Sequence, residues 1–146
     1  MKALDIVEEA LADIEKGAIE ASTYTEDMFL SGPVPQPMKR YEYVLLMKNL
    51  VGACPDWNFR ARDFTVLGDT VKVTVSVTGT QTRTLPALMP GMKALPPTNK
   101  RFILPEEHIS FKVRGDKISE CVVDMVPGGG VMGVLAQLGV QLKKAA

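Results

Sequence analysis

Histidine and cysteine are scarce in this sequence. Its 146 residues include one histidine, His108, and two cysteines, Cys54 and Cys121. A zinc site or a disulfide framework needs more of these residues, and the two cysteines stand outside any metal-binding spacing. One histidine, with no Gly-x-Ser-x-Gly string, also excludes most serine-triad chemistry. We therefore expect no metal, no cofactor and two reduced thiols.

The sequence also lacks an excess of charge of either sign. Lys plus Arg and Asp plus Glu each total 17, so the formal net charge is zero. A nucleic-acid-binding protein normally carries a basic excess. No apolar run approaches the roughly 18 residues that a membrane crossing requires, and the acidic, amphipathic residues 1–9 are unlike a signal peptide. We expect a cytoplasmic protein without nucleic-acid or membrane partners.

What the sequence does contain is the composition of an ordinary folded domain. Hydrophobic residues make up 46% and charged residues 23%, which predicts one domain over residues 1–146. Apolar side chains recur at helical spacing over residues 2–21, and a second helix is predicted from Met38 to Ala53. Between them, residues 32–37 hold three prolines, which favour an extended chain.

Strand patterns follow the second helix. Alternate valines from Val71 to Val77 predict a strand with one buried face, and residues 109–113 repeat that pattern. The hydrophobic phase changes near Arg62 and Asp63, which predicts a bulge or a bend. A last strand is predicted over residues 118–126, and a short apolar helix over residues 131–142. This order of elements predicts an α+β fold in which helices cover a curved sheet.

Five short strings occur in an order that carries a family resemblance. They are Cys54-Pro55-Asp56, Thr78-Gly79-Thr80, Pro96-Pro97-Thr98-Asn99-Lys100, Asp116-Lys117-Ile118-Ser119-Glu120 and Gln137-Leu138-Gly139. Over roughly residues 5 to 140 the sequence resembles the SnoaL-like, polyketide cyclase-related family of the nuclear-transport-factor-2-like superfamily. The resemblance implies a cone: a strongly curved mixed or antiparallel sheet packed on the N-terminal helices, with a short C-terminal helix and an apolar cavity.

The resemblance implies two alternative functions. The first is a cofactor-independent cyclase or isomerase that acts on a lipophilic, carbonyl-containing small molecule by general acid–base catalysis. The second is a non-catalytic module that binds a ligand or another protein, because many members of the superfamily only bind. A fold alone does not choose between them, so the side chains in the cavity must be considered.

The positions that carry acids and bases in related enzymes hold other residues here. The isomerase base corresponds to Gly32, and the cyclase acid and its histidine correspond to Val123 and Cys121. The nearest titratable groups are Asp124 and His108, which we expect to be the proton carriers if there is catalysis. Strand alternation directs both toward the outer face unless a bulge intervenes, and a surface position is the alternative.

A further set of residues is expected to line the cavity. Aromatic and polar candidates are Tyr24, Tyr41, Trp57 and Asn58, and the last predicted strand adds Cys121, Val123 and Met125. The apolar, proline-rich loop of residues 84–97 is expected to cover the cavity mouth or a partner subunit with Leu88, Met89 and Met92. This loop and the open sheet predict a homodimer.

Overall fold

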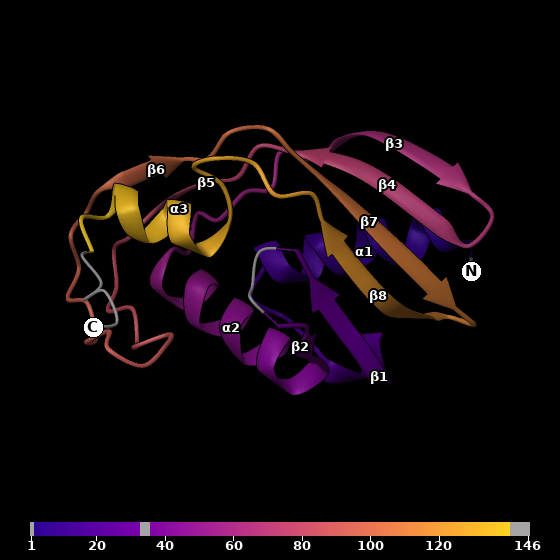
Figure 1. The fold of residues 1–146 in the computed structure, drawn as a ribbon, viewed down its shortest axis with the longest axis horizontal. Helices are drawn as coiled ribbons and strands as arrows, with labels where there is room; N and C mark the ends of the chain where they lie inside the picture. The colour runs from indigo at the N-terminus through magenta and orange to yellow at the C-terminus, as the bar shows by residue number, and fades with distance from the viewer. Residues whose placement is uncertain (1, 33–35, 141–146) are drawn as a thin grey trace.

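A computed structural model describes residues 2–32 and 36–140 (Figure 1). The helices are α1 (Ala3–Glu15), α2 (Arg40–Ala53) and α3 (Gly130–Gln137), with a 3₁₀ turn at Ala21–Thr23. The strands are β1 (Tyr24–Ser31), β2 (Met38–Lys39), β3 (Arg62–Leu67), β4 (Thr70–Val75), β5 (Thr78–Thr80), β6 (Arg101–Ile103), β7 (Glu107–Arg114) and β8 (Lys117–Val123). Within the described residues, no helix has the length and hydropathy that a membrane crossing requires.

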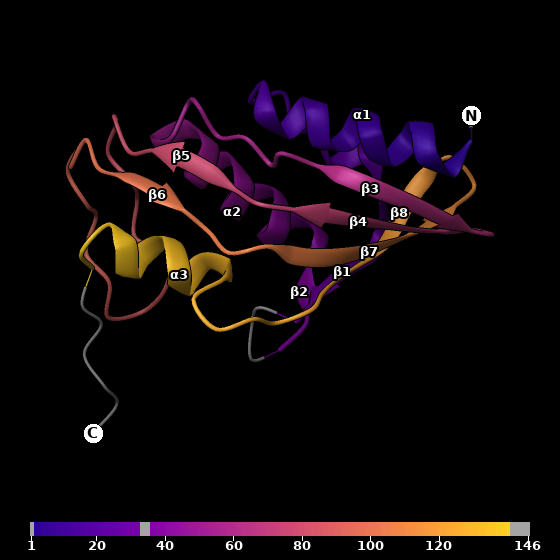
Figure 2. The ribbon, with the colours of Figure 1, turned by 90° about the horizontal axis from the view of Figure 1, so that it is seen from above.

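The main sheet is mixed and has the strand order β2-β1-β8-β7-β4-β3. The pairing of β1 with β8 is parallel, and the other pairs are antiparallel. Strands β5 and β6 form a separate two-stranded sheet close to α3 (Figure 1). In Figure 2, α1 runs along one face of the main sheet, whereas α3 lies beyond its end. This arrangement is the α+β, curved-sheet fold that the sequence predicted.

Helix α1 is shorter than the predicted helix over residues 2–21. It ends at Glu15 because Gly17 adopts a φ of 74°, which reverses the chain direction. The amide of Ala18 donates to the Asp13 carbonyl oxygen at 2.8 Å, and the amide of Gly17 donates to the Ile14 carbonyl oxygen at 2.9 Å. These two hydrogen bonds complete the last turn of the helix, so the chain can enter β1.

The predictions for the second and third helices agree with the structure except at their ends. Helix α2 ends at Ala53 as predicted, and the first two residues of the predicted range form β2 instead. Helix α3 begins one residue earlier than predicted and ends at Gln137. Of the predicted range 131–142, residues 141–142 lie outside the described part of the chain.

The alternation in β4 produces the buried face that the sequence predicted. Val71, Val73 and Val75 are each at most 2% exposed, and they belong to the core between the sheet and the helices. The predicted bulge near Arg62 and Asp63 is also present. The pairing of β3 with β4 shifts register between Arg62 and Thr65, and Asp63 has a φ of 57°.

Strand β8 differs from its predicted range and carries a bulge of its own. It ends at Val123 rather than residue 126, because the chain then leaves the sheet to reach α3. The pairing of β7 with β8 shifts register, with Val113 opposite Ile118 but Lys112 opposite Glu120. Ile118 and Cys121 are consequently both buried, although they are three positions apart and regular alternation would place them on opposite faces. The pairing is regular from Glu120 to Val123, so the bulge does not turn residue 124 toward the inner face.

Candidate functional site

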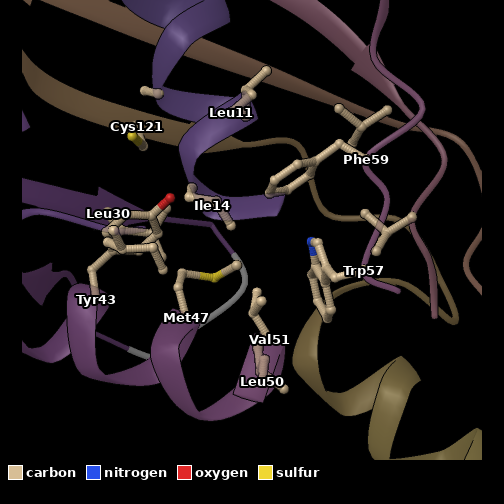
Figure 3. Close-up of a cluster of buried hydrophobic side chains, with 14 of the residues drawn as sticks. Leu11, Ile14, Leu30, Tyr43, Met47, Leu50, Val51, Trp57, Phe59 and Cys121 are labelled. Carbon is tan, nitrogen blue, oxygen red and sulfur yellow. The ribbon is translucent and has the colours of Figure 1, made fainter. Parts of the chain in front are cut away.

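An apolar cavity of about 110 Å³ lies between the helices and the inner face of the sheet. Its walls combine α2 with the aromatic segment that follows it, strands β7 and β8, and the start of α3. Figure 3 shows part of the cluster of buried hydrophobic side chains around this cavity, which come from α1, α2 and the sheet. The lining residues include Leu11, Tyr43, Met47, Trp57, Phe59, Val75, Glu107, Phe111, Cys121, Val123 and Val134.

Three of the residues expected to bind a ligand line this cavity: Trp57, Cys121 and Val123. Val123 of β8 pairs with Ile109 of the neighbouring strand β7, and both side chains lie on the cavity side of the sheet. Tyr24 is 2% exposed but does not line the cavity. Its ring packs edge-on against that of Tyr43, with the ring centroids 5.4 Å apart. Tyr43, which the sequence analysis did not select, therefore takes the place at the cavity that was expected for Tyr24.

Three other expected ligand contacts lie at the surface. Tyr41 is 69% exposed because it stands on the outer side of α2, and Met125 is 59% exposed because it follows the end of β8. Asn58 is also exposed, and its Oδ1 accepts a hydrogen bond from the Arg60 amide at 2.8 Å. Its side chain stabilises the local turn, so the expected ligand role does not match its position.

The loop of residues 84–97 packs against its own chain rather than lining the cavity. Met92 is buried, and Leu88 and Met89 are half-buried. The Leu88 amide lies 3.5 Å from the Met92 sulfur, so the loop folds back on itself. Leu85 at its start is 1% exposed. Much of the apolar surface that suggested a lid or a dimer contact is thus covered within the chain.

Asp124 and His108, the expected proton carriers, lie on the opposite side of the sheet from the cavity. Both are exposed and line a polar hollow with Asp63, Thr65, Lys72, Thr74 and Ser110. His108 Nδ1 lies 3.1 Å from Thr74 Oγ1 of the neighbouring strand. Strand alternation explains the position, because the neighbours Glu107 and Val123 face inward. The expectation that these two residues carry protons inside the cavity does not fit their location.

The carboxylate that does line the cavity is that of Glu107, which the sequence analysis did not select. It is 4% exposed and belongs to the first residue of β7. A signal was present in the sequence, because Glu107 shares its phase with Ile109 and Phe111 on the apolar side of that strand. An acidic residue on the buried side of an alternating strand is uncommon and points to a special role.

The start of α3 holds the Glu107 carboxylate in place. Its Oε1 accepts a hydrogen bond from the Gly130 amide at 3.3 Å. Gly129 allows this approach, since a Cβ at that position would lie 2.8 Å from the carboxyl carbon of Glu107. Burial raises the pKa of Glu107 above its ordinary value, and the hydrogen bond from Gly130 opposes that shift.

Two further polar groups of the cavity wall are held in their neutral forms. Burial raises the pKa of the Tyr43 hydroxyl and of the Cys121 thiol. Both groups are hydrogen-bond donors of weak acidity at neutral pH, and a buried neutral thiol is a poor nucleophile. Among the described residues that line the cavity, Glu107 is therefore the group suited to accept and return a proton.

No protein-family model and no curated protein matches this sequence. Solved structures do match it. A candidate SnoaL-like polyketide cyclase from Jannaschia sp. CCS1 superimposes with a TM-score of 0.68 at 15% identity, over 95% of this chain and 92% of that one. IdmH of Streptomyces antibioticus, a candidate polyketide cyclase, matches with a TM-score of 0.69 at 20% identity, over 96% and 100% of the two chains.

A third solved structure carries a different description. AclR of Streptomyces galilaeus, a candidate hydroxylase, has a TM-score of 0.69 at 18% identity, over 94% of this chain and 95% of that one. The chain thus has the SnoaL-like fold that its sequence strings suggested. Proteins with this fold carry different descriptions, so the function must be argued from the cavity.

Proposed function

We propose that this protein binds a small lipophilic carbonyl compound in its apolar cavity and moves a proton next to the carbonyl group. The reaction would be of the cyclase or isomerase type and would need no cofactor. The observation that supports the proposal is the buried carboxyl group of Glu107, which stands in an apolar wall and has a raised pKa. A buried carboxyl group with a raised pKa is suited to general acid–base catalysis.

The proposed step begins with the ionised carboxylate of Glu107. It takes a proton from the carbon beside the ligand carbonyl, and the electron pair of the broken C–H bond forms an enolate. In an isomerisation the Glu107 carboxyl returns this proton to another carbon. In a cyclisation the enolate carbon attacks a second carbonyl of the same molecule, and the proton goes to the resulting alkoxide. Protons and electrons balance in both cases.

The cavity volume indicates a suitable first ligand. The cavity of about 110 Å³ is somewhat smaller than an engineered apolar cavity of ~150 Å³ that holds benzene. Acetophenone is larger than benzene, so this one-ring ketone fits only when half-buried wall residues such as Leu46 and Val131 move outward. Larger substrates would require a wider opening of the same wall.

Deuterium exchange into acetophenone tests the proposed step without knowledge of the natural substrate. Acetophenone is incubated with the protein in D₂O, and mass spectrometry follows deuterium entering its methyl group. We expect Glu107→Gln to lower the protein-dependent rate by about a hundredfold or more. Glu106→Gln is the matched control, since that carboxylate faces outward and pairs with Arg62 at 2.6 Å. Equal exchange rates for the protein and the Glu107→Gln variant would contradict the proposal.

The second candidate function is ligand binding without catalysis. The observation in its favour is that Glu107 already accepts a hydrogen bond from Gly130, so its carboxylate contributes to holding α3 against the sheet. This alternative predicts that acetophenone binds saturably and gains no deuterium beyond the buffer rate. A cytoplasmic location and a homodimer remain predictions under both functions.

A further inference from the structure

The indole N–H of Trp57 is a buried donor without a protein acceptor. Within the described residues, its nitrogen is the one fully buried side-chain nitrogen or oxygen that has no hydrogen-bond partner. The residue as a whole is 6% exposed, so it is more than nine-tenths buried. Buried polar groups of folded proteins almost always find partners, so an unpaired donor requires an explanation.

The position of Trp57 connects this donor with the cavity. Trp57 lies just beyond α2 and contributes to the cavity wall. In Figure 3 the indole nitrogen is at the end of the ring that is turned toward Phe59 and the interior of the cluster. The ring is held between Phe59 and Phe102, with centroid distances of 5.9 and 5.7 Å. The donor is therefore fixed in direction before any ligand arrives.

The rest of the wall offers little else to a ligand oxygen. Besides Glu107 and the neutral groups of Tyr43 and Cys121, the cavity is lined by apolar side chains. Apolar walls with a few well-placed polar groups are typical of small-molecule sites, where the polar groups set the orientation. An N–H in such a wall favours a ligand with an acceptor oxygen over an apolar ligand of the same shape.

We infer that the Trp57 indole N–H is the oxygen-recognition group of the cavity and donates a hydrogen bond to a carbonyl oxygen of the ligand. Trp57 is thus a specificity-determining residue, and the preferred ligands are compact apolar molecules that carry a carbonyl group. The inference rests on the cavity being the ligand site of the proposed function, but it does not require catalysis. The competing explanation is that the N–H faces the ring of Phe59, whose plane is inclined at 79° to the indole.

The sequence offers a direct spectroscopic test, because Trp57 is its only tryptophan. In ¹⁵N-labelled protein a single indole N–H signal reports on this donor. The signal is followed while the protein is titrated with acetophenone or with α-methylstyrene, which has the same shape but a CH₂ group in place of the oxygen. We expect acetophenone to move the indole proton signal downfield, and α-methylstyrene to cause only the smaller shift of a nearby ring.

A variant provides the second measurement. Trp57→Phe keeps an aromatic ring and removes the donor, so the preference for acetophenone over α-methylstyrene should fall about three- to tenfold relative to the unchanged protein. Tyr41→Phe, at an exposed aromatic residue, is the matched control and should leave this ratio unchanged.

Three results would overturn the inference. Identical indole shifts with both compounds, or an unchanged affinity ratio in Trp57→Phe, would favour the contact with Phe59. If neither compound produces a saturable shift up to its solubility limit, the cavity does not take such ligands. Glu107→Gln separates this inference from the proposed reaction, because it should lower protein-dependent deuterium exchange by about a hundredfold or more and leave the acetophenone-induced indole shift in place.

Discussion

Two buried regions of this protein differ in whether their polar side chains are hydrogen-bonded within the chain. At the base of the loop of residues 84–97, the Gln81 side chain is 0% exposed and is fully hydrogen-bonded. Its Nε2 donates to the carbonyl oxygens of Arg83, Leu95 and Pro96 at 3.0–3.2 Å, and its Oε1 accepts from the amide and hydroxyl of Thr98. In the cavity, Trp57 donates to no group of the residues that the structure describes, and Glu107 accepts one hydrogen bond from them.

This difference separates a structural role from the ligand-binding role that we propose. The hydrogen bonds of Gln81 hold the two ends of the loop together, so the polar atoms of its side chain are paired within the chain. The polar groups of Trp57 and Glu107 belong to the cavity wall, where the partner that we propose for them is a ligand. The comparison also explains why the loop, although rich in Leu and Met, does not act as a free apolar lid.

The largest effect is expected from Gln81→Leu. This substitution removes every hydrogen bond of the buried side chain and leaves backbone groups of the loop without partners, so we expect the free energy of unfolding to fall by ~3 kcal/mol or more. Urea denaturation measures the loss. Gln137→Leu is the matched control, since Gln137 also bonds the backbone, at Ile103, but is exposed, and its loss should be near 1 kcal/mol.

Equal losses of stability in the two glutamine variants would contradict the comparison. In that case burial would not distinguish the two sites, and Gln81 would not be the group that holds the loop together. Hydrogen exchange of the Leu95 and Thr98 amides gives a second measurement, because both amides should lose protection in Gln81→Leu.

A smaller effect is expected from the ionisation of Glu107. Burial raises its pKa in the folded protein above the ordinary value of 4.5, so above pH 4.5 the unfolded chain binds fewer protons than the folded one. Stability therefore falls as the pH rises from 4.5 through the folded pKa. Glu107→Gln lacks this loss, and denaturation from pH 4 to pH 8 should show the unchanged protein becoming progressively less stable relative to the variant. Parallel pH profiles would contradict the assigned burial effect.

The smallest effect is expected on the outer face of the sheet. Asp124→Asn and His108→Gln change exposed side chains that line the polar hollow, so the stability should change by no more than about 0.5 kcal/mol. Deuterium exchange into acetophenone should stay within about twofold of the unchanged protein. A hundredfold loss of exchange in Asp124→Asn would instead return the proton-carrying role to this residue and remove it from Glu107.

Features that depend on neighbours in the sequence were predicted well. Alternation predicted the valines of β4, and helical spacing predicted the extent of α2. A change of hydrophobic phase indicated the bulge near Arg62. The inward direction of Glu107 also follows from alternation, since its phase matches that of Ile109, but the positions of the family's acids indicated Asp124 instead. Tyr24 was misplaced because packing between distant elements decides which buried side chains line the cavity. Met125 was misplaced because β8 ends at Val123 and leaves it exposed.

By itself the sequence determined the order of helices and strands, the inner faces of the sheet and the SnoaL-like fold, because these follow from local periodicity and from strings with fixed order. The tertiary structure alone decided which polar groups share the cavity. Trp57 follows α2 and Glu107 begins β7, and no local pattern relates them. Their burial in one wall, with the indole N–H unpaired, arises from the packing of distant elements, which brings polar groups out of water whether or not the chain supplies their partners.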